Sequence, residues 1–180
     1  RGSIRSWFLD QQCPEPPTGR PPLHHMEKYL RIIAHAGGAT QDPALRAPAR
    51  PMEPRSDGGA VLRLGLCAGA EYGQAKRWPL ERYAQAANEI SARLSRPSEW
   101  FFFGAPGEKA MGEALSAQVT AAHRNLVGGT SLTELIAELR ACDLLLTNDT
   151  GTMHLAAALG VPTVSIFGST EPSLTGPVGD

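Results

Sequence analysis

Apolar residues form short runs that alternate with amphipathic segments from about residue 60 onward. The runs at 100–103 and 144–146 are continuous, which is typical of strands that are buried on both faces. The run at 61–66 is apolar apart from Arg63 and Gly65 and is also expected to form a buried strand. Between the first two runs, apolar residues recur at helical spacing over residues 80–94, directly after a proline that suits the first turn of a helix.

The clearest predicted helix begins at Ser131, because Ser131 and Glu134 have the spacing of a capping box. A shorter helix is predicted over residues 151–159. The other predicted elements are a helix around 111–119 and short strands at 126–127 and 161–167. Five apolar strands alternating with four helices predict an α/β fold, a Rossmann-like parallel sheet covered on both faces. Ligands of such sheets bind beyond the carboxyl ends of the strands, which here are the loops 67–78, 104–108 and 147–154.

The first 59 residues lack this regularity. Residues 1–22 contain five prolines and are predicted to be irregular. A helix should follow, because Met26, Tyr29, Leu30 and Ile33 recur at helical spacing before a glycine pair that can end a helix. Residues 39–59 return to proline, alanine and glycine, as linkers do.

Composition restricts the class of protein. The 180 residues, 42% hydrophobic, are enough for one sizeable core. A net charge of -1 argues against an extended nucleic-acid surface. The three cysteines have neither zinc-site nor disulfide spacing, which fits a reducing cytosol. No apolar run approaches the roughly 20 residues that cross a bilayer, so any membrane contact should be peripheral.

The strongest chemical signal is the segment 147–154, Thr-Asn-Asp-Thr-Gly-Thr-Met-His, which joins a strand directly to a helix. Free amides at a helix start suit a diphosphate, and Gly151 allows its close approach. Asp149 is better suited to sugar hydroxyls, although Asp149 or Thr150 as a simple helix cap explains the pattern equally well. His154 either donates to a phosphate or is a half-buried structural histidine.

The loop 69–79 contains Lys76, which can neutralise a leaving diphosphate. The competing interpretation is a solvated surface lysine. Trp78 fits a packing role better than a stacking role, because it precedes the helix-opening Pro79. The glycines match neither the dinucleotide-binding nor the P-loop pattern, which weakens the dehydrogenase and ATPase interpretations.

Glu108 lies just past the second predicted strand, where it can accept hydrogen bonds from a ribose. A glutamate that favours a helix amino end explains it at least as well. The chain has no D-x-D pair and no His, Cys or carboxylate cluster with metal-ligand spacing, so a metal-dependent mechanism has no support in the sequence.

Three segments together resemble glycosyltransferase family 9, the lipopolysaccharide heptosyltransferases, and within it most closely those of type II. They are GAEYGQAKRWP at 69–79, FFFGAPGE at 101–108, and the long segment 125–177 that begins NLVGGTSLTEL. Residues 19–38 are also similar to the last helix before the interdomain linker of that family.

The resemblance implies a GT-B architecture in which this chain supplies the half that binds a nucleotide sugar. It implies inverting, metal-independent transfer of heptose from ADP-heptose to the lipopolysaccharide inner core, with no cofactor, in the cytoplasm or at the inner face of the inner membrane. Carried over by position, Lys76 would contact the diphosphate or sugar, Asp149 the heptose hydroxyls and Glu108 the ribose. The backbone of Thr150, Gly151, Thr152 and Met153 would meet the diphosphate, with His154 behind it.

By the same resemblance, residues 1–38 are a remnant of the acceptor domain with its last helix, 39–59 a linker, and 60–180 the nucleotide-sugar-binding domain, truncated at its end. No residue inherits the general base, so the chain is expected to bind ADP-sugar but to transfer heptose poorly. Apolar surface left by absent neighbours favours self-association. The rival interpretations are a non-catalytic nucleotide-binding module and a related transferase that uses another nucleotide sugar.

Overall fold

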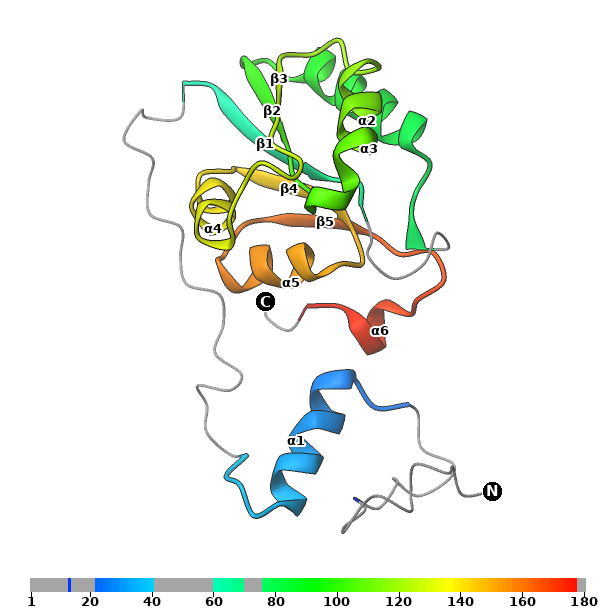
Figure 1. Cartoon of the computed structure of the whole chain (residues 1–180), viewed down its shortest axis with the longest axis vertical. Coiled ribbons are helices and arrows are strands. Elements are labelled where there is room, and N and C mark those ends of the chain that lie inside the picture. Colours follow the sequence, from blue (N-terminus) through cyan, green and yellow to red (C-terminus); the bar gives the residue numbers. More distant parts are fainter. Residues whose placement is uncertain (1–12, 14–21, 41–59, 70–75, 178–180) are drawn as a thin grey trace.

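The computed structural model describes residue 13 and residues 22–40, 60–69 and 76–177 (Figure 1). The strands are β1 (Leu62–Cys67), β2 (Ser98–Phe102), β3 (His123–Asn125), β4 (Leu144–Asn148) and β5 (Thr163–Ile166). The helices are α1 (His25–His35), α2 (Leu80–Arg93), α3 (Lys109–Ser116), α4 (Leu132–Arg140), α5 (Gly151–Ala158) and α6 (Pro172–Thr175), with a 3-10 turn, η4 (Pro106–Glu108), before α3.

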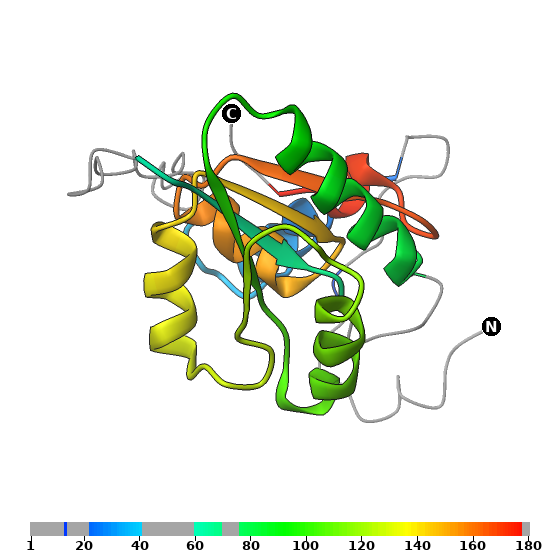
Figure 2. The same ribbon diagram turned by 90° about the horizontal axis from the view of Figure 1, so that it is seen from above.

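The strands form one parallel sheet in the order β3-β2-β1-β4-β5. Helices α2 and α3 cover one face, and α4 and α5 cover the other (Figures 1 and 2). The predicted α/β class with a parallel, Rossmann-like sheet is therefore confirmed. The strands near the middle of the sheet are apolar because side chains on both of their faces are removed from water.

Alternate residues of β1, β2 and β4 enter separate cores. Leu64, Leu66 and Phe102 pack under α2 and α3 together with Tyr83. Phe101 and Leu145 belong to the other core, whose members also include Leu139 from α4 and Ala156 from α5. This division follows from the two-residue period of a strand.

One strand prediction is wrong in position. The apolar pair 126–127 was expected to form a strand, but β3 comprises the three residues before it. These pair with β2 at the sheet edge, where His123 lies opposite Trp100. Val127 instead packs into the core after the strand has ended. A short edge strand can be polar, so hydrophobicity located the buried residues rather than the paired ones.

The predicted capping box begins α4. The Ser131 hydroxyl accepts a hydrogen bond from the Glu134 amide at 3.3 Å, and the Glu134 carboxylate accepts one from the Ser131 amide at 2.8 Å. The Ser131 amide and the Ser131 hydroxyl, which donates to the same carboxylate oxygen at 2.7 Å, hold the pKa of the Glu134 carboxyl below its ordinary value. The predicted end of α5 is also confirmed, because Gly160 follows it with a φ of 78°.

Helix α1 lies at the far end of the molecule from β3 (Figure 1). The His24 ring caps it by accepting from the Met26 amide at 3.1 Å, and the other ring nitrogen lies 3.0 Å from the carbonyl oxygen of Gly176. The apolar side chains of Tyr29 and Ile32 remain 64% and 53% exposed. Self-association through this surface stays a prediction.

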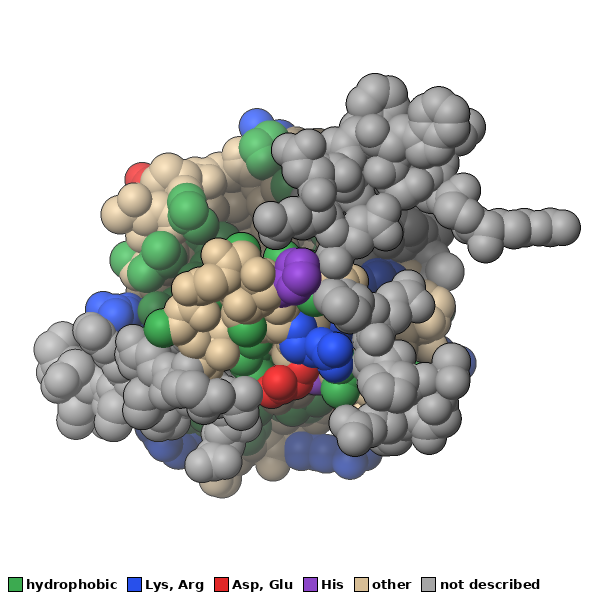
Figure 3. All heavy atoms as spheres, turned by 90° about the horizontal axis from the view of Figure 1, so that it is seen from below, with side chains coloured by type: hydrophobic (Ala, Val, Ile, Leu, Met, Phe, Trp, Pro, Cys, Tyr) green, Lys and Arg blue, Asp and Glu red, His purple; other side chains and the backbone are tan. Residues whose placement is uncertain are grey.

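Seen from the end where α1 lies, acidic, basic and histidine side chains lie close together (Figure 3). This mixture of signs accords with the small net charge of -1.

No helix within the described part of the chain is long and apolar enough to cross a membrane.

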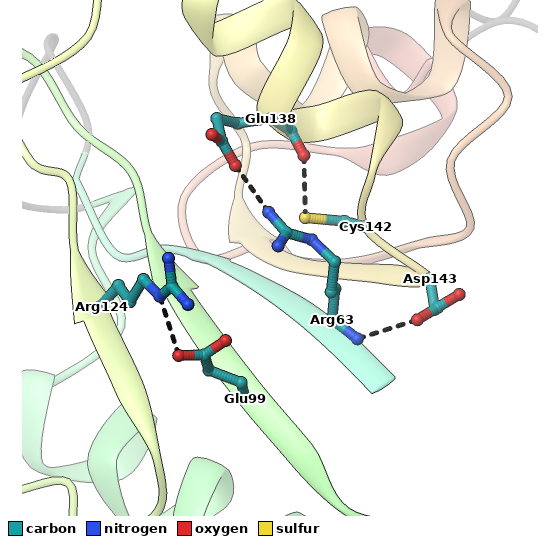
Figure 4. Close-up of polar contacts among 6 residues, drawn as sticks. All are labelled: Arg63, Glu99, Arg124, Glu138, Cys142 and Asp143. Atoms are coloured by element: carbon teal, nitrogen blue, oxygen red, sulfur yellow. Dashed lines mark hydrogen bonds and ion pairs between the residues drawn. The ribbon is translucent and has the colours of Figure 1, made fainter. Parts of the chain in front are cut away.

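The amino end of the sheet contains polar contacts that serve the fold (Figure 4). The Arg63 guanidinium donates to Glu138 of α4 at 2.6 Å and stacks 3.7 Å above the Phe101 ring. The Arg63 amide donates to the Asp143 carboxylate at 2.8 Å, which joins β1 to the start of β4. Arg124 pairs with Glu99 across β3 and β2 at 2.9 Å.

The buried face of α4 leads to a stability prediction. Leu139 is fully buried, whereas Leu132 on the same helix is 68% exposed. Leu139→Ala should lower the free energy of unfolding by about 2–5 kcal/mol through lost burial and a cavity. Leu132→Ala should change it by less than about 0.5 kcal/mol. Urea denaturation measures both, and equal losses would contradict the orientation of α4.

Candidate functional site

A pocket of about 1240 Å³ opens beyond the carboxyl ends of β1, β2 and β4. Strands β1 and β4 are neighbours, but the helices that follow them cover opposite faces of the sheet. This reversal leaves a crevice between them, where ligands of doubly wound sheets bind. From the three predicted loops the lining includes Gly69, Lys76, Arg77, Gly104, Glu108, Asp149, Thr150, Gly151 and Thr152. From α1 with its N-cap residue, and from α4 and α6, it includes His24, His25, Tyr29, Leu132, Leu135 and Thr175.

The first turn of α5 faces this pocket. Thr150 is its N-cap residue, in an extended conformation, and its side chain makes no capping hydrogen bond. The amides of Gly151 and Thr152 have no hydrogen-bond partner among the described residues. A Cβ at Gly151 would meet nothing within 4 Å, so the backbone there is open to a ligand. Unpaired amides at the positive end of a helix dipole form a site for an anion.

Lys76 and Asp149 form an ion pair beside that turn. Lys76 Nζ lies 2.9 Å from Asp149 Oδ2, and their side chains are 29% and 6% exposed. The solvated-lysine interpretation is therefore wrong. The helix-cap interpretation of this segment also fails in its side-chain form, because the Asp149 carboxylate bonds to Lys76 and Thr150 makes no capping bond.

The Asp149 carboxyl stays charged. Burial alone would raise its pKa, but hydrogen bonds from Lys76, Thr170 and Thr175 and the positive charge of Lys76 together outweigh burial, so the pKa lies below its ordinary value. The pair carries no net charge, and the unpaired amides of α5 remain available to an anion.

Two residues of the site were not singled out from the sequence. The Thr175 hydroxyl of α6 lies 3.3 Å from Asp149 Oδ2, on which Lys76 also converges. Asn148 lies fully buried directly before Asp149. A threonine in a short carboxyl-terminal helix carries no local signal for this role, whereas an asparagine at the end of an apolar strand is a buried polar group that must find partners.

Glu108 reaches the pocket from η4. One carboxylate oxygen accepts from the Ala105 amide at 2.9 Å, and the other lies 3.7 Å from the Arg77 guanidinium. A Cβ on Gly69 would come within 2.4 Å of this carboxylate, so only glycine permits the close approach. The two sequence interpretations of Glu108 are thus compatible, since it supports the turn and also lines the pocket.

His154 lines the pocket with a side chain that is exposed but not fully so, and both predicted roles of this histidine stay predictions. The burial that it does have lowers the pKa of its imidazole, Asp149 opposes this, and the charges of His24 and Lys76 add to the lowering. The ring is therefore neutral at pH 7 and can still donate one hydrogen bond.

Cys67 lines the pocket as a protonated thiol, the less nucleophilic form of cysteine. Burial raises the pKa of its thiol, which a hydrogen bond with Thr152 only partly offsets. None of the three cysteines, which all lie among the described residues, forms a disulfide. Within the described residues, no group of three or more His, Cys, Asp or Glu side chains could hold a metal ion.

Comparison with known proteins identifies the family. The sequence profile of glycosyltransferase family 9 (heptosyltransferase) matches residues 3–180. The chain belongs to glycosyltransferase family 9. The family predicted from three sequence segments is thereby confirmed.

Individual relatives within family 9 agree. Lipopolysaccharide heptosyltransferase 2 of Salmonella typhimurium is 37% identical over 119 residues, which are 64% of this chain and 33% of the relative. The solved structure of E. coli ADP-heptose lps heptosyltransferase II matches with a TM-score of 0.62 and 26% identity, over 88% of this chain and 42% of that one. E. coli heptosyltransferase WaaC with ADP matches with a TM-score of 0.54 and 26% identity, over 67% and 36%.

This family 9 chain thus spans about a third of the length of the curated relatives that it matches. The solved neighbours named above are heptosyltransferases, which agrees with the fold class that the family resemblance implied. The predicted domain boundaries stay predictions.

Most of the predicted family 9 site residues share the pocket. These are Lys76, Glu108, Asp149, Thr150, Gly151, Thr152 and His154. Met153 differs from expectation. Its amide donates to the Thr150 carbonyl at 3.1 Å within the first turn of α5, and its side chain is fully buried. Helical geometry accounts for this, because an α5 amide at that position already has an acceptor one turn back. The ligand contacts of all these residues stay predictions.

The ion pair allows a direct test by titration. Because its pKa is lowered, the Asp149 carboxylate stabilises the fold above its unfolded pKa of about 3.9, and this contribution is lost as the pH falls through the folded pKa. Lys76→Met should raise the pKa of Asp149, since burial remains while the charge and hydrogen bond disappear. Lys28→Met, exposed on α1, should leave it unchanged. Carboxyl ¹³C NMR titration measures both, and an unaltered Asp149 pKa in Lys76→Met contradicts the pairing.

Proposed function

We propose that this chain supplies the donor-binding half of a heptosyltransferase, which transfers heptose from ADP-heptose to the lipopolysaccharide inner core. The observation that carries the proposal is the convergence of the unpaired Gly151 and Thr152 amides and the Lys76 ammonium on one pocket. Two amides, a helix dipole and a cation together suit a diphosphate. The names of the relatives and of their solved structures add the identity of the donor.

In the proposed reaction, an acceptor hydroxyl attacks the anomeric carbon from the face opposite ADP, which inverts the configuration. The bond to the diphosphate breaks, and negative charge develops on the departing oxygen. The α5 amides and Lys76 stabilise that charge where it appears. None of the described residues is assigned as the base that removes the acceptor proton.

Asp149 is proposed to accept hydrogen bonds from the heptose hydroxyls. Its carboxylate borders the pocket and stays charged because Lys76 and Thr175 hold it. We also propose that Glu108 accepts a hydrogen bond from the ribose and that His154 donates one to a phosphate, since both residues line the pocket.

The mechanism is proposed to need no metal and no cofactor. Lys76 and the helix dipole of α5 provide positive charge of the kind that a metal ion otherwise supplies to a leaving diphosphate. We further propose that the protein works in the cytoplasm, since buried thiols at Cys67 and Cys142 that form no disulfide suit a reducing compartment.

Nucleotide binding by the chain tests the proposal. Isothermal titration calorimetry should detect ADP binding, with UDP and GDP binding more weakly. A preference for UDP or GDP would point instead to a related transferase with another donor. If none of the three nucleotides binds, the proposal is wrong. Turnover with ADP-heptose and a core acceptor separates an enzyme from a binding module.

Lys76→Ala should weaken ADP binding by about 10- to 100-fold, because a charge-assisted hydrogen bond contributes about 1.5–3 kcal/mol. Lys28→Ala, which removes an exposed lysine from α1, serves as the matched control and should bind like the unmodified chain. Equal affinities for all three proteins would remove Lys76 from the site.

A further inference from the structure

Asn148, the last residue of β4, uses both ends of its buried amide group. Its side chain is fully buried. The oxygen Oδ1 accepts from the Tyr83 hydroxyl at 2.7 Å and from the Trp78 amide at 3.1 Å. The nitrogen Nδ2 donates to the carbonyl of Ala68 at 2.7 Å and to that of Gly69 at 3.3 Å. All four partners lie 65 or more positions away in the chain.

These partners lie on both sides of the segment that leads to Lys76. Ala68 and Gly69 follow β1, while Trp78 comes two residues after Lys76 and just before α2. The backbone of Asn148 itself continues into Asp149. A single side chain therefore sets the positions of the two backbone segments from which the ammonium and carboxylate of the ion pair project.

Only a side chain that both donates and accepts, as the carboxamide of Asn148 does, can satisfy these four partners. The two carbonyls require donors, and the Trp78 amide and the Tyr83 hydroxyl require an acceptor. Burial raises the pKa of Tyr83, so its hydroxyl keeps the proton that it donates. Trp78 packs edge-on against the Tyr83 ring with 5.0 Å between centroids, which holds the two donors next to each other.

We propose that Asn148 is a positioning residue of the anion site, which holds Lys76 at the distance from which its ammonium reaches both Asp149 and a bound diphosphate. The identity of the diphosphate rests on the proposed function. The geometry of the Lys76–Asp149 pair does not, so the two claims can fail separately.

Calorimetry with ADP and with adenosine tests this role in the 180-residue chain. Asn148→Ala should weaken ADP binding by about tenfold and leave adenosine binding unchanged, because only the diphosphate depends on Lys76. Tyr83→Phe, which removes one hydroxyl from the junction and keeps the ring, should weaken ADP binding about two- to threefold, again without affecting adenosine. An unchanged ratio of ADP to adenosine affinity in folded Asn148→Ala overturns the proposal. Should that variant fail to fold, an unchanged ratio in Tyr83→Phe overturns it.

Asn88 offers a matched control. Its side chain also bridges separate segments, accepting from the amides of Thr120 and Ala121 and donating to the Gln118 carbonyl, but it does so before β3, at the opposite end of the sheet. Asn88→Ala should lower stability and leave both affinities unchanged. A fall in the ADP to adenosine ratio in Asn88→Ala would mean that general loosening explains the effect, and would overturn the positioning role.

A second measurement does not depend on any nucleotide. In Asn148→Ala the Asp149 pKa should rise toward its ordinary value, as Lys76 moves out of reach, whereas Asn88→Ala should leave it unchanged. Should the unmodified chain bind neither ADP nor adenosine, the proposed function fails, and this titration still decides the inference. An Asp149 pKa equal to that of the unmodified chain would overturn it.

Discussion

The ion pair between Lys76 and Asp149 sets the charge balance on which the site depends. A carboxylate that is 6% exposed cannot remain ionised without a partner, and a diphosphate cannot approach it without a cation nearby. Lys76 meets both needs, because its ammonium lies 2.9 Å from the carboxylate at the pocket wall. The amides of Gly151 and Thr152 add positive potential without adding another group that must be neutralised.

The parallel sheet explains why these groups meet. The carboxyl ends of β1, β2 and β4 point to the same edge, so three loops that are distant in sequence line one pocket. The polar groups at the two ends of the sheet have different roles. At the amino end, hydrogen bonds of Arg63 link β1 to α4 and to the start of β4. At the carboxyl end, the first turn of α5 keeps unpaired amides.

Most helices and strands could be predicted from the sequence, because buried segments need apolar residues at regular positions. Apolar runs indicated β1 and β4, and the Ser131–Glu134 spacing indicated the start of α4. The prediction misplaced β3, since an edge strand pairs through its backbone and places no demand on its side chains. The loops of the site were also predictable, because topology determines which loops meet.

The sequence alone could not predict which side chains from distant parts of the chain would contact each other. Lys76 and Asp149 are 73 positions apart, and nothing local distinguishes a paired lysine from a solvated one. The contributions of Thr175 and Asn148 depend in the same way on contacts with distant segments. Met153 shows the opposite case, in which a local rule about the first turn of a helix would have been enough.

Amide NMR of the ¹⁵N-labelled chain tests the central claim most directly, because it reports on the α5 amides themselves. Addition of ADP should produce large shifts of the Gly151 and Thr152 signals, and adenosine should produce much smaller ones. If ADP binds while both signals stay in place, the first turn of α5 does not receive the diphosphate and the account of the site is wrong.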